Sequence, residues 1–216
     1  MKLYGADVCP FVHRVRLVLA EKRIEHEYVA IDLGKKPSWY YDVLPTGKVP
    51  LLEHNGFRIW ESDIVCEYLD EAFLSPPLRP KEPGLRAQLR LIFSWGGSHF
   101  ISTFYKLLAA QDPESQEQLS QQMMTVLKEM DERLSVEKGP FFQTALSLAD
   151  LGLYPWFERW AVLEHYRGLK LPRELTHLNA WMTELQKRDS VKELRVQDDY
   201  FIGQYRGYAE GTRIPA

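Results

Sequence analysis

The chain has 216 residues, of which 45% are hydrophobic, enough for one large domain or two modest ones with a substantial core. The formal net charge of -3 and the scattered lysines and arginines argue against nucleic acid or an anionic membrane as the main partner. The two cysteines, Cys9 and Cys66, are too few for a disulfide scaffold and suit a reducing compartment. Without a visible signal peptide or an apolar run of roughly 20 residues, the sequence predicts a soluble, cytoplasmic protein.

Strand and helix signals alternate in the first third of the chain. Helical spacing of apolar residues follows Cys9, and a second clear helix opens at Ser62. Asn55-Gly56 is a strong signal for a type I′ hairpin turn. Strands are predicted at residues 2–4, 27–33, 49–54 and 57–60, and residues 35–44 form a short helix or an irregular turn. The order is βαβ, a connection, and then ββα, which predicts a small sheet with helices.

Four prolines between residues 75 and 83 mark a linker, because proline interrupts regular structure. We therefore expect one domain at residues 1–74 and another at residues 84–216. Beyond the linker the strand signal largely disappears, which predicts an all-helical domain. Helices are expected at residues 85–110, 114–134, 147–166, 175–187 and 190–194. The Gly96-Gly97 pair should weaken or bend the first of them.

Two local features stand out in the helical half. Ser147 and Asp150 match a capping box, whose role is to stabilise a helix start. Pro155 lies one turn further on and should kink that helix. The kink would turn Trp156 and its aromatic neighbours toward other elements. Such rings are more often core than site, although they could wall an apolar pocket.

Cys9 is the candidate nucleophile. Pro10 suits the first helical position, so Cys9 reads as the residue that caps the helix. A thiolate there meets unbonded N–H groups and the positive end of the helix dipole, which lower its pKa, and His13 and Arg14 add positive charge. The alternative is a small buried cysteine with no chemistry. Because Val12 occupies the position of a second cysteine, a C-x-x-C couple is excluded, and redox chemistry would need an external thiol.

Two residue pairs downstream could hold a peptide ligand. Val49 precedes Pro50 at the start of a strand and could offer its N–H and C=O to an extended peptide, or the proline could simply mark a sheet edge. Ser62 as a helix cap would bind a carboxylate, and Glu61 could pair with an ammonium group. An amino-acid head group carries both charges. Alone, however, Glu-Ser before a helix is usually only a cap.

The motifs in order resemble a cytosolic glutathione transferase. They are C-P-F, K-K-P-x-W, G-K-V-P-L-L, E-S-x-I-x-x-E-Y-L-D-E, the proline linker and S-L-A-D-L. Segments 9–11, 35–39, 66–71 and 155–159 resemble the omega class most closely. Each motif alone is moderately specific. Their shared order and spacing, from the first strand to about Arg195, carry the resemblance.

The resemblance implies an α/β thioredoxin-like N-terminal domain (βαβ-ββα), an all-α C-terminal domain and a glutathione site on the former. Cys9 takes the place of the catalytic residue, while Tyr4 is too early and lies in the strand. Trp156 matches a position in the second-substrate pocket. The residues implied to bind glutathione are Phe11, Leu33, Lys36, Val49, Pro50 with a cis bond, Glu61 and Ser62.

The implied activity is glutathione-dependent thiol transfer or reduction of mixed disulfides, dehydroascorbate or glutathionyl conjugates, with glutathione as cosubstrate and no metal. Its partners would be glutathione and a small disulfide, electrophilic or oxidised substrate. Rival interpretations are a plant-like dehydroascorbate reductase, a lambda-class protein, or a non-catalytic module that binds ligands or other proteins.

Further expectations concern the remaining parts of the chain. The resemblance implies a homodimer with residues 62–72 and 85–110 as contacts. Cys66 should be a packing residue, and His13 should lie on the exposed or partly exposed side of its helix. The aromatic tail, residues 197–216, should fold back onto the body.

Overall fold

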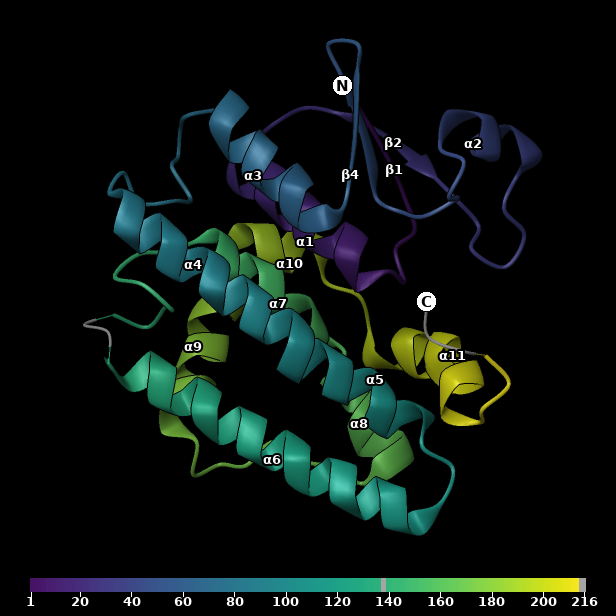
Figure 1. The fold of residues 1–216 in the computed structure, drawn as a ribbon, viewed down its shortest axis with the longest axis vertical. Helices are drawn as coiled ribbons and strands as arrows, with labels where there is room; N and C mark the ends of the chain where they lie inside the picture. Colours follow the sequence, from purple (N-terminus) through teal and green to yellow (C-terminus); the bar gives the residue numbers. More distant parts are fainter. Residues whose placement is uncertain (137–138, 214–216) are drawn as a thin grey trace. The chain divides into compact units, whose positions relative to one another are not determined.

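The computed structural model describes residues 1–136 and 139–213 and shows two compact units, Met1–Arg79 and Pro80–Ala216 (Figure 1). Their boundary falls inside the predicted 75–83 linker. Residues 137–138 and 214–216, which belong to the predicted second domain and in part to the aromatic tail, lie outside the described residues.

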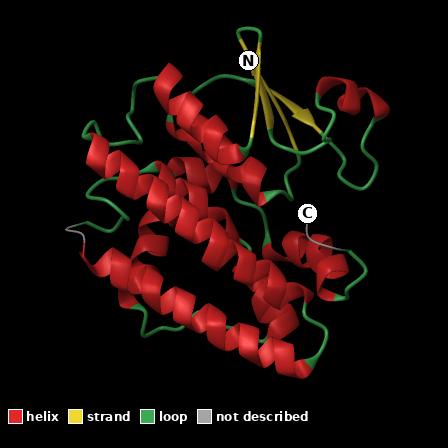
Figure 2. Cartoon of the chain, viewed as in Figure 1, coloured by secondary structure: helices red, strands yellow, loops and turns green. Residues whose placement is uncertain are grey.

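The first unit contains one sheet and its helices (Figure 2). The strands lie in the order β2-β1-β3-β4, with β1 parallel to β2 and antiparallel to β3, and β3 antiparallel to β4. This is the predicted βαβ-ββα arrangement, which is confirmed. The elements in chain order are β1 (Lys2–Gly5), α1 (Pro10–Glu21), β2 (Glu27–Ala30), α2 (Ser38–Val43), β3 (Leu51–His54), β4 (Phe57–Trp60) and α3 (Ser62–Ala72).

The two faces of the sheet are covered by different helices. Tyr4 of β1 and Leu51 of β3 pack with Tyr40 of α2 in one buried cluster. Because side chains alternate along a strand, Leu3 and Leu52 point to the opposite face, where α1 and α3 pack against each other. The alternation of apolar residues in β1 and β3 thus places α1 and its N-terminus beside the sheet.

Two strands are shorter than predicted. β2 ends at Ala30, although the N–H of Ile31 still donates to Gly5 (2.7 Å). β3 begins at Leu51 rather than at Val49, because Pro50 has no N–H to donate to a ladder. The predicted hairpin turn is confirmed: Asn55 and Gly56, between β3 and β4, both have positive φ (50° and 82°).

A buried ion cluster joins the end of α1 to α3 and to the segment that follows α3. Lys22 is fully buried at its side chain and lies 2.7 Å from the carboxylate of Asp70. Its ammonium also donates to the carbonyls of Phe73 (2.7 Å) and Pro76 (2.6 Å), and Arg79 binds the second carboxylate oxygen of Asp70 at 2.9 Å. These bonds satisfy buried charges that would otherwise be costly.

The described part of the second unit is helical, as predicted. Its elements are α4 (Pro83–Trp95), the π-helix η1 (Gly96–Ile101), α5 (Ser102–Ala109), α6 (Pro113–Val136), α7 (Leu148–Glu158), α8 (Trp160–Arg167), α9 (Thr176–Gln186), α10 (Asp189–Leu194) and α11 (Asp198–Ala209). In this unit as in the first, no described helix is both long enough and apolar enough to cross a membrane.

The Gly96-Gly97 pair marks an irregularity, as the sequence predicts. The helical path from α4 to α5 widens there into the π-helical turn η1. A Cβ on Gly96 would lie 2.4 Å from Leu153 of α7, and one on Gly152 would lie 2.3 Å from Phe93 of α4. Glycines therefore let two helices approach closely at this crossing.

The helix predicted at residues 147–166 is two helices. Pro155 lies inside α7, which ends at Glu158, and Arg159 (φ -96°, ψ 10°) separates α7 from α8. The buried guanidinium of Arg159 donates to the carbonyl of Pro155 (2.8 Å). Phe157 stacks on Trp160 with ring centres 5.8 Å apart, and both rings are buried. The aromatics at the bend are therefore core residues of this unit.

Helix α11 folds back onto α5 and α8, which confirms the expectation for the described part of the tail. Arg167 of α8 fastens it, because its guanidinium donates to Leu107 (3.0 Å) and Leu108 at the end of α5 and to Ala209 at the end of α11 (2.8 Å). Gln111 also donates to Ala209 (3.0 Å). Two helix C-termini thus share one cation, which suits their negative ends.

Asp150 is the buried hydrogen-bond centre of the second unit. The capping box with Ser147 is confirmed, and the carboxylate also accepts from the N–H of Phe142 (3.0 Å) and the indole of Trp181 (2.9 Å). Burial raises the pKa of Asp150, and these donors oppose that rise. One carboxylate thus joins the start of α7 to the preceding loop and to α9.

We expect Asp150→Ala to lower the free energy of unfolding by about 3–5 kcal/mol, because several buried donors lose their acceptor. Asp112→Ala is the matched control, since this exposed aspartate accepts only from the start of its own helix, at Ser115. Urea unfolding of both variants measures the difference. Equal losses would contradict the central role of Asp150.

Candidate functional site

Cys9 lies at the N-cap of α1, as predicted. Its backbone is extended (φ -78°, ψ 117°), and Pro10 occupies the first helical position. The carbonyl of Cys9 accepts from the N–H of His13 (3.0 Å), the first bond of the helix, and its own N–H donates to Ala6 (3.0 Å). The side chain is partly exposed. A thiol in this position meets the positive end of the helix, as the sequence argument requires.

The hydroxyl of Tyr4 is engaged elsewhere. It donates to the carboxylate of Glu53 at 2.7 Å. Burial and this carboxylate raise the pKa of Tyr4 to about 12. Tyr4 is therefore unsuited to stabilise a thiolate, in agreement with its predicted place in the strand.

Cys66 is a packing residue, which confirms the prediction. It is 1% exposed on α3, and burial raises the pKa of its thiol to about 12. A thiol that ionises so reluctantly is a poor nucleophile at neutral pH. The two cysteines of the chain therefore lie in opposite environments.

His13 is buried, so the expectation that it lies on an exposed side of α1 is wrong. Nearly the whole helix is enclosed, with Val12, Val15 and Leu17 fully buried, which leaves little exposed surface for His13. Arg14 is also buried. Its guanidinium lies 5.3 Å from the ring centre of Phe11 and donates to the hydroxyl of Ser62 (3.3 Å).

The helix cap at α3 is Glu61 rather than Ser62, so that part of the prediction is wrong. The carbonyl of Glu61 accepts the first helical bond, from Val65 (2.9 Å), while Ser62 is the first helical residue. The hydroxyl of Ser62 binds Arg14 instead of capping the helix. Glu61 is exposed and has φ +62°, a sparsely populated conformation for a residue with a side chain. Backbone strain of this kind is enriched at functional sites.

Val49 and Leu33 pack against the same buried cluster, beside Tyr40 and Leu51. The Val49–Pro50 peptide bond is cis, as the resemblance implies. The hydroxyl of Tyr40 donates to the carbonyl of Lys48 (2.7 Å) and thereby fixes the chain just before Val49. Val49 itself lies outside the β3–β4 ladder.

Lys36 lies in the loop that precedes α2 and is half-buried. The side chain of Asp32 turns this loop by accepting from Gly34 (2.8 Å) and Lys35 (3.2 Å). Phe11, at the start of α1, is also half-buried. Trp156 belongs to the second unit and is fully buried, so its place in a second-substrate pocket stays a prediction.

Contacts within the first unit connect several predicted residues: Phe11 and Ser62 through Arg14, and Leu33 and Val49 through one cluster. The linking role of Arg14 was missed. The sequence shows only a cation one turn inside the helix, and its partner depends on how α1 packs on α3.

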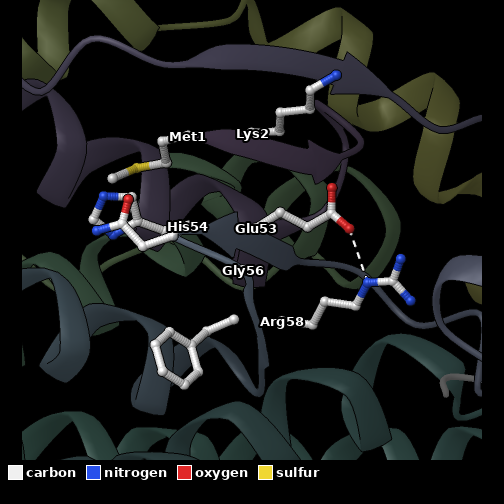
Figure 3. Close-up of a pocket in the computed structure, with 8 residues that line it drawn as sticks. Met1, Lys2, Glu53, His54, Gly56 and Arg58 are labelled. Atoms are coloured by element: carbon white, nitrogen blue, oxygen red, sulfur yellow. Dashed lines mark hydrogen bonds and ion pairs between the residues drawn. The ribbon is translucent and has the colours of Figure 1, made fainter.

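A surface cavity of about 500 Å³ lies elsewhere on the first unit (Figure 3). Its lining residues are Met1, Lys2, Glu53, His54, Asn55, Gly56, Phe57 and Arg58. Its polar side chains bind one another or near neighbours: Glu53 holds Arg58 (2.8 Å) and Tyr4, and His54 meets Tyr68 (2.8 Å). None of the predicted site residues lines it. Among the described residues, no group of three or more His, Cys, Asp and Glu could hold a metal ion.

Comparisons with known proteins show to which family the chain belongs. Residues 3–77 match the model of the glutathione S-transferase N-terminal domain, and residues 113–184 match that of the C-terminal domain. Human (Homo sapiens) glutathione S-transferase omega-2 is 33% identical over 205 residues, covering 94% of this chain and 83% of the relative. The chain belongs to the glutathione S-transferase family.

Two other comparisons extend this finding. A rice protein (Oryza sativa subsp. japonica) named probable glutathione S-transferase DHAR1, cytosolic, is 31% identical over 90% of this chain and 87% of its own length. The crystal structure of glutathione transferase Omega 3C from Trametes versicolor matches with a TM-score of 0.86 at 29% identity, covering 98% of this chain and 91% of that chain. The thioredoxin-like and helical parts of the transferase fold are thus both present.

We expect the pKa of Cys9 to lie below the value of about 8.5 of an ordinary thiol, because the thiolate would face the N-terminus of α1. The rate of alkylation against pH, with the label assigned by mass spectrometry, gives this value. Cys66 is the internal control and should remain unlabelled in the folded protein, since it is buried. A titration of Cys9 at or above 8.5 would remove the basis for an activated thiolate.

Proposed function

We propose that this transferase is a glutathione-dependent thioltransferase of omega-like type, with Cys9 as its single catalytic cysteine. The observation that carries the proposal is a partly exposed cysteine at the N-cap of α1, while the Tyr4 hydroxyl is bound to Glu53. A tyrosine or serine at the reacting position would hold the thiolate of glutathione for conjugation. A cysteine there favours disulfide exchange with glutathione.

Glutathione would bind along the first unit. Val49 would pair with its backbone, since Val49 is outside the strand ladder. The exposed Glu61 would meet its ammonium group, and Ser62, with Arg14 behind it, would meet the γ-glutamyl carboxylate. The remaining proposed contacts are Lys36 with the glycine carboxylate, and Phe11, Leu33 and Pro50 along the peptide.

The proposed reaction has two exchange steps. The Cys9 thiolate attacks the glutathionyl sulfur of a mixed disulfide, forms a disulfide with glutathione and releases the substrate as a thiolate. The thiolate of a second glutathione then attacks the glutathionyl sulfur of that adduct. This step yields oxidised glutathione and restores the Cys9 thiolate. In the net exchange one free glutathione thiol forms a disulfide with the glutathionyl group of the substrate, the substrate sulfur is reduced to a thiol, and no metal is required.

Dehydroascorbate and glutathionyl conjugates are the other substrates we propose. Dehydroascorbate has no sulfur, so the Cys9 thiolate would add to a carbonyl carbon; a glutathione thiolate would then attack the Cys9 sulfur, release ascorbate and leave the Cys9–glutathione disulfide, which a second glutathione resolves. In a conjugate the Cys9 thiolate would attack the glutathionyl sulfur and release the organic group as a carbanion that takes up a proton. Trp156 is retained as a proposed second-substrate residue. The relatives named glutathione S-transferase omega-2 and DHAR1 support a glutathione-dependent transferase or reductase. A cytoplasmic location is proposed as well. One rice relative is named cytosolic, whereas another is named chloroplastic.

Cys9→Ser should lower the rate of mixed-disulfide reduction by more than about 100-fold, because serine cannot form the intermediate. A glutathione-coupled disulfide assay measures the rate, and mass spectrometry should find a glutathione adduct on Cys9 of the native chain. Cys66→Ala is the matched control and should keep most of the activity. If Cys9→Ser abolished conjugation but left disulfide reduction intact, the mechanism would be wrong.

We also propose a homodimer, because apolar side chains on the expected contact helices face solvent. Ile64 on α3 is 53% exposed, and Leu91 on α4 is 68% exposed. Leu91→Glu should shift sedimentation from dimer to monomer, because it places a charge in an apolar interface. Leu74→Glu, at a leucine that is 78% exposed outside these helices, should leave a dimer intact. A native chain that sediments as a monomer would contradict the proposal.

A further inference from the structure

Three side chains hold the loop that carries Cys9. Asp7 lies in the turn between β1 and α1, two residues before the cysteine. The guanidinium of Arg16, two turns into α1, contacts its carboxylate at 2.6 Å. The same guanidinium lies 4.8 Å from the ring centre of Tyr28 on β2. The turn is therefore tied both to the helix that follows it and to the neighbouring strand.

Electrostatics join this cluster to Cys9. Burial raises the pKa of Tyr28, and the charge of Asp7 raises it further. Cys9 also contributes to that rise, while Arg16 opposes it. Asp7, Arg16 and Cys9 therefore all lie within electrostatic reach of Tyr28.

We propose that Arg16 neutralises the Asp7 carboxylate so that the thiol of Cys9, two residues further along the chain, can ionise. The inference rests on the proposed role of Cys9 as the nucleophile. Asp7 lies in the turn in which the N–H of Cys9 donates to Ala6 (3.0 Å). Its charge is unfavourable for a thiolate, because two negative charges repel.

The other cations of α1 do not replace Arg16 in this role. Arg14 is buried and its guanidinium is directed to Ser62 and Phe11. His13 is buried as well. Arg16, by contrast, contacts the Asp7 carboxylate directly, and both side chains reach solvent, with 27% and 54% exposed. Their effect on Cys9 should accordingly be moderate and sensitive to salt.

The test is a double-mutant cycle on the alkylation of Cys9. Arg16→Met removes the positive charge that contacts the Asp7 carboxylate, so the pKa of Cys9 should rise and its alkylation at pH 7 should slow by about threefold in low salt. Adding Asp7→Asn to Arg16→Met removes the repelling charge and should restore the native titration. If the ion pair acted only by holding the turn in place, the double variant would not recover the native titration, because it has lost the ion pair as well.

Arg58→Met is the matched control. It removes an arginine that lies 2.8 Å from a carboxylate, that of Glu53, in the same unit, and should leave the titration of Cys9 unchanged. In 1 M salt, where the screening length is about 3 Å, the effect of Arg16→Met should shrink. No change in the pKa of Cys9 in Arg16→Met, or no recovery in the double variant, would overturn the proposal. The titration uses no glutathione, so its outcome is independent of whether the native chain reduces disulfides.

Discussion

The enclosure of α1 is the constraint on which the candidate site depends. Val12, Val15, Leu17, Val18 and Leu19 are all fully buried, so the helix is held along its length. Cys9 occupies the N-cap position at the N-terminal end of α1 and is partly exposed. Because α1 is packed along its length, it cannot shift when a charge forms at its N-terminus. Its unbonded N–H groups therefore form a fixed environment for a thiolate.

The same enclosure explains why charged side chains near the site have internal partners. Arg14 cannot reach solvent and instead joins Phe11 to Ser62. Lys22, just beyond the other end of α1, is buried against Asp70 and against carbonyls that follow α3. Both cations link α1 to the region of α3, one at each end of the helix. Arg14 and Lys22 therefore help to fix α1, which carries Cys9 at its start, against α3, which carries Ser62.

Local chemistry made much of this predictable. The proline after Cys9, the Asn55-Gly56 turn and the Ser147–Asp150 box each act over a few residues, and the structure contains all three features. The errors arose where tertiary packing decides. His13 looked like a surface residue because only one side of a helix is usually buried, and Ser62 looked like a cap because serine favours that position.

Features that depend on contacts between distant residues were again only partly predictable from the sequence. Gly96-Gly97 predicted an irregular helix, but the sequence could not show that Leu153 of α7 is the residue that lies against Gly96. The break at Arg159 was missed because Pro155 suggested a kink one turn earlier. The partners of Asp150 beyond its own capping box, Phe142 and Trp181, are also invisible until the fold is known.

The contrast between the two cysteines is the strongest argument for a one-cysteine site. Cys66 occupies the interior of α3, where burial raises its pKa to about 12 and leaves a packing role. Cys9 has the opposite surroundings, and Val12 leaves it without a neighbouring thiol. A nucleophilic cysteine that cannot form a disulfide within its own motif must complete an exchange cycle with a thiol from solution. Because the chain belongs to the glutathione S-transferase family, glutathione is the thiol that we propose for this exchange.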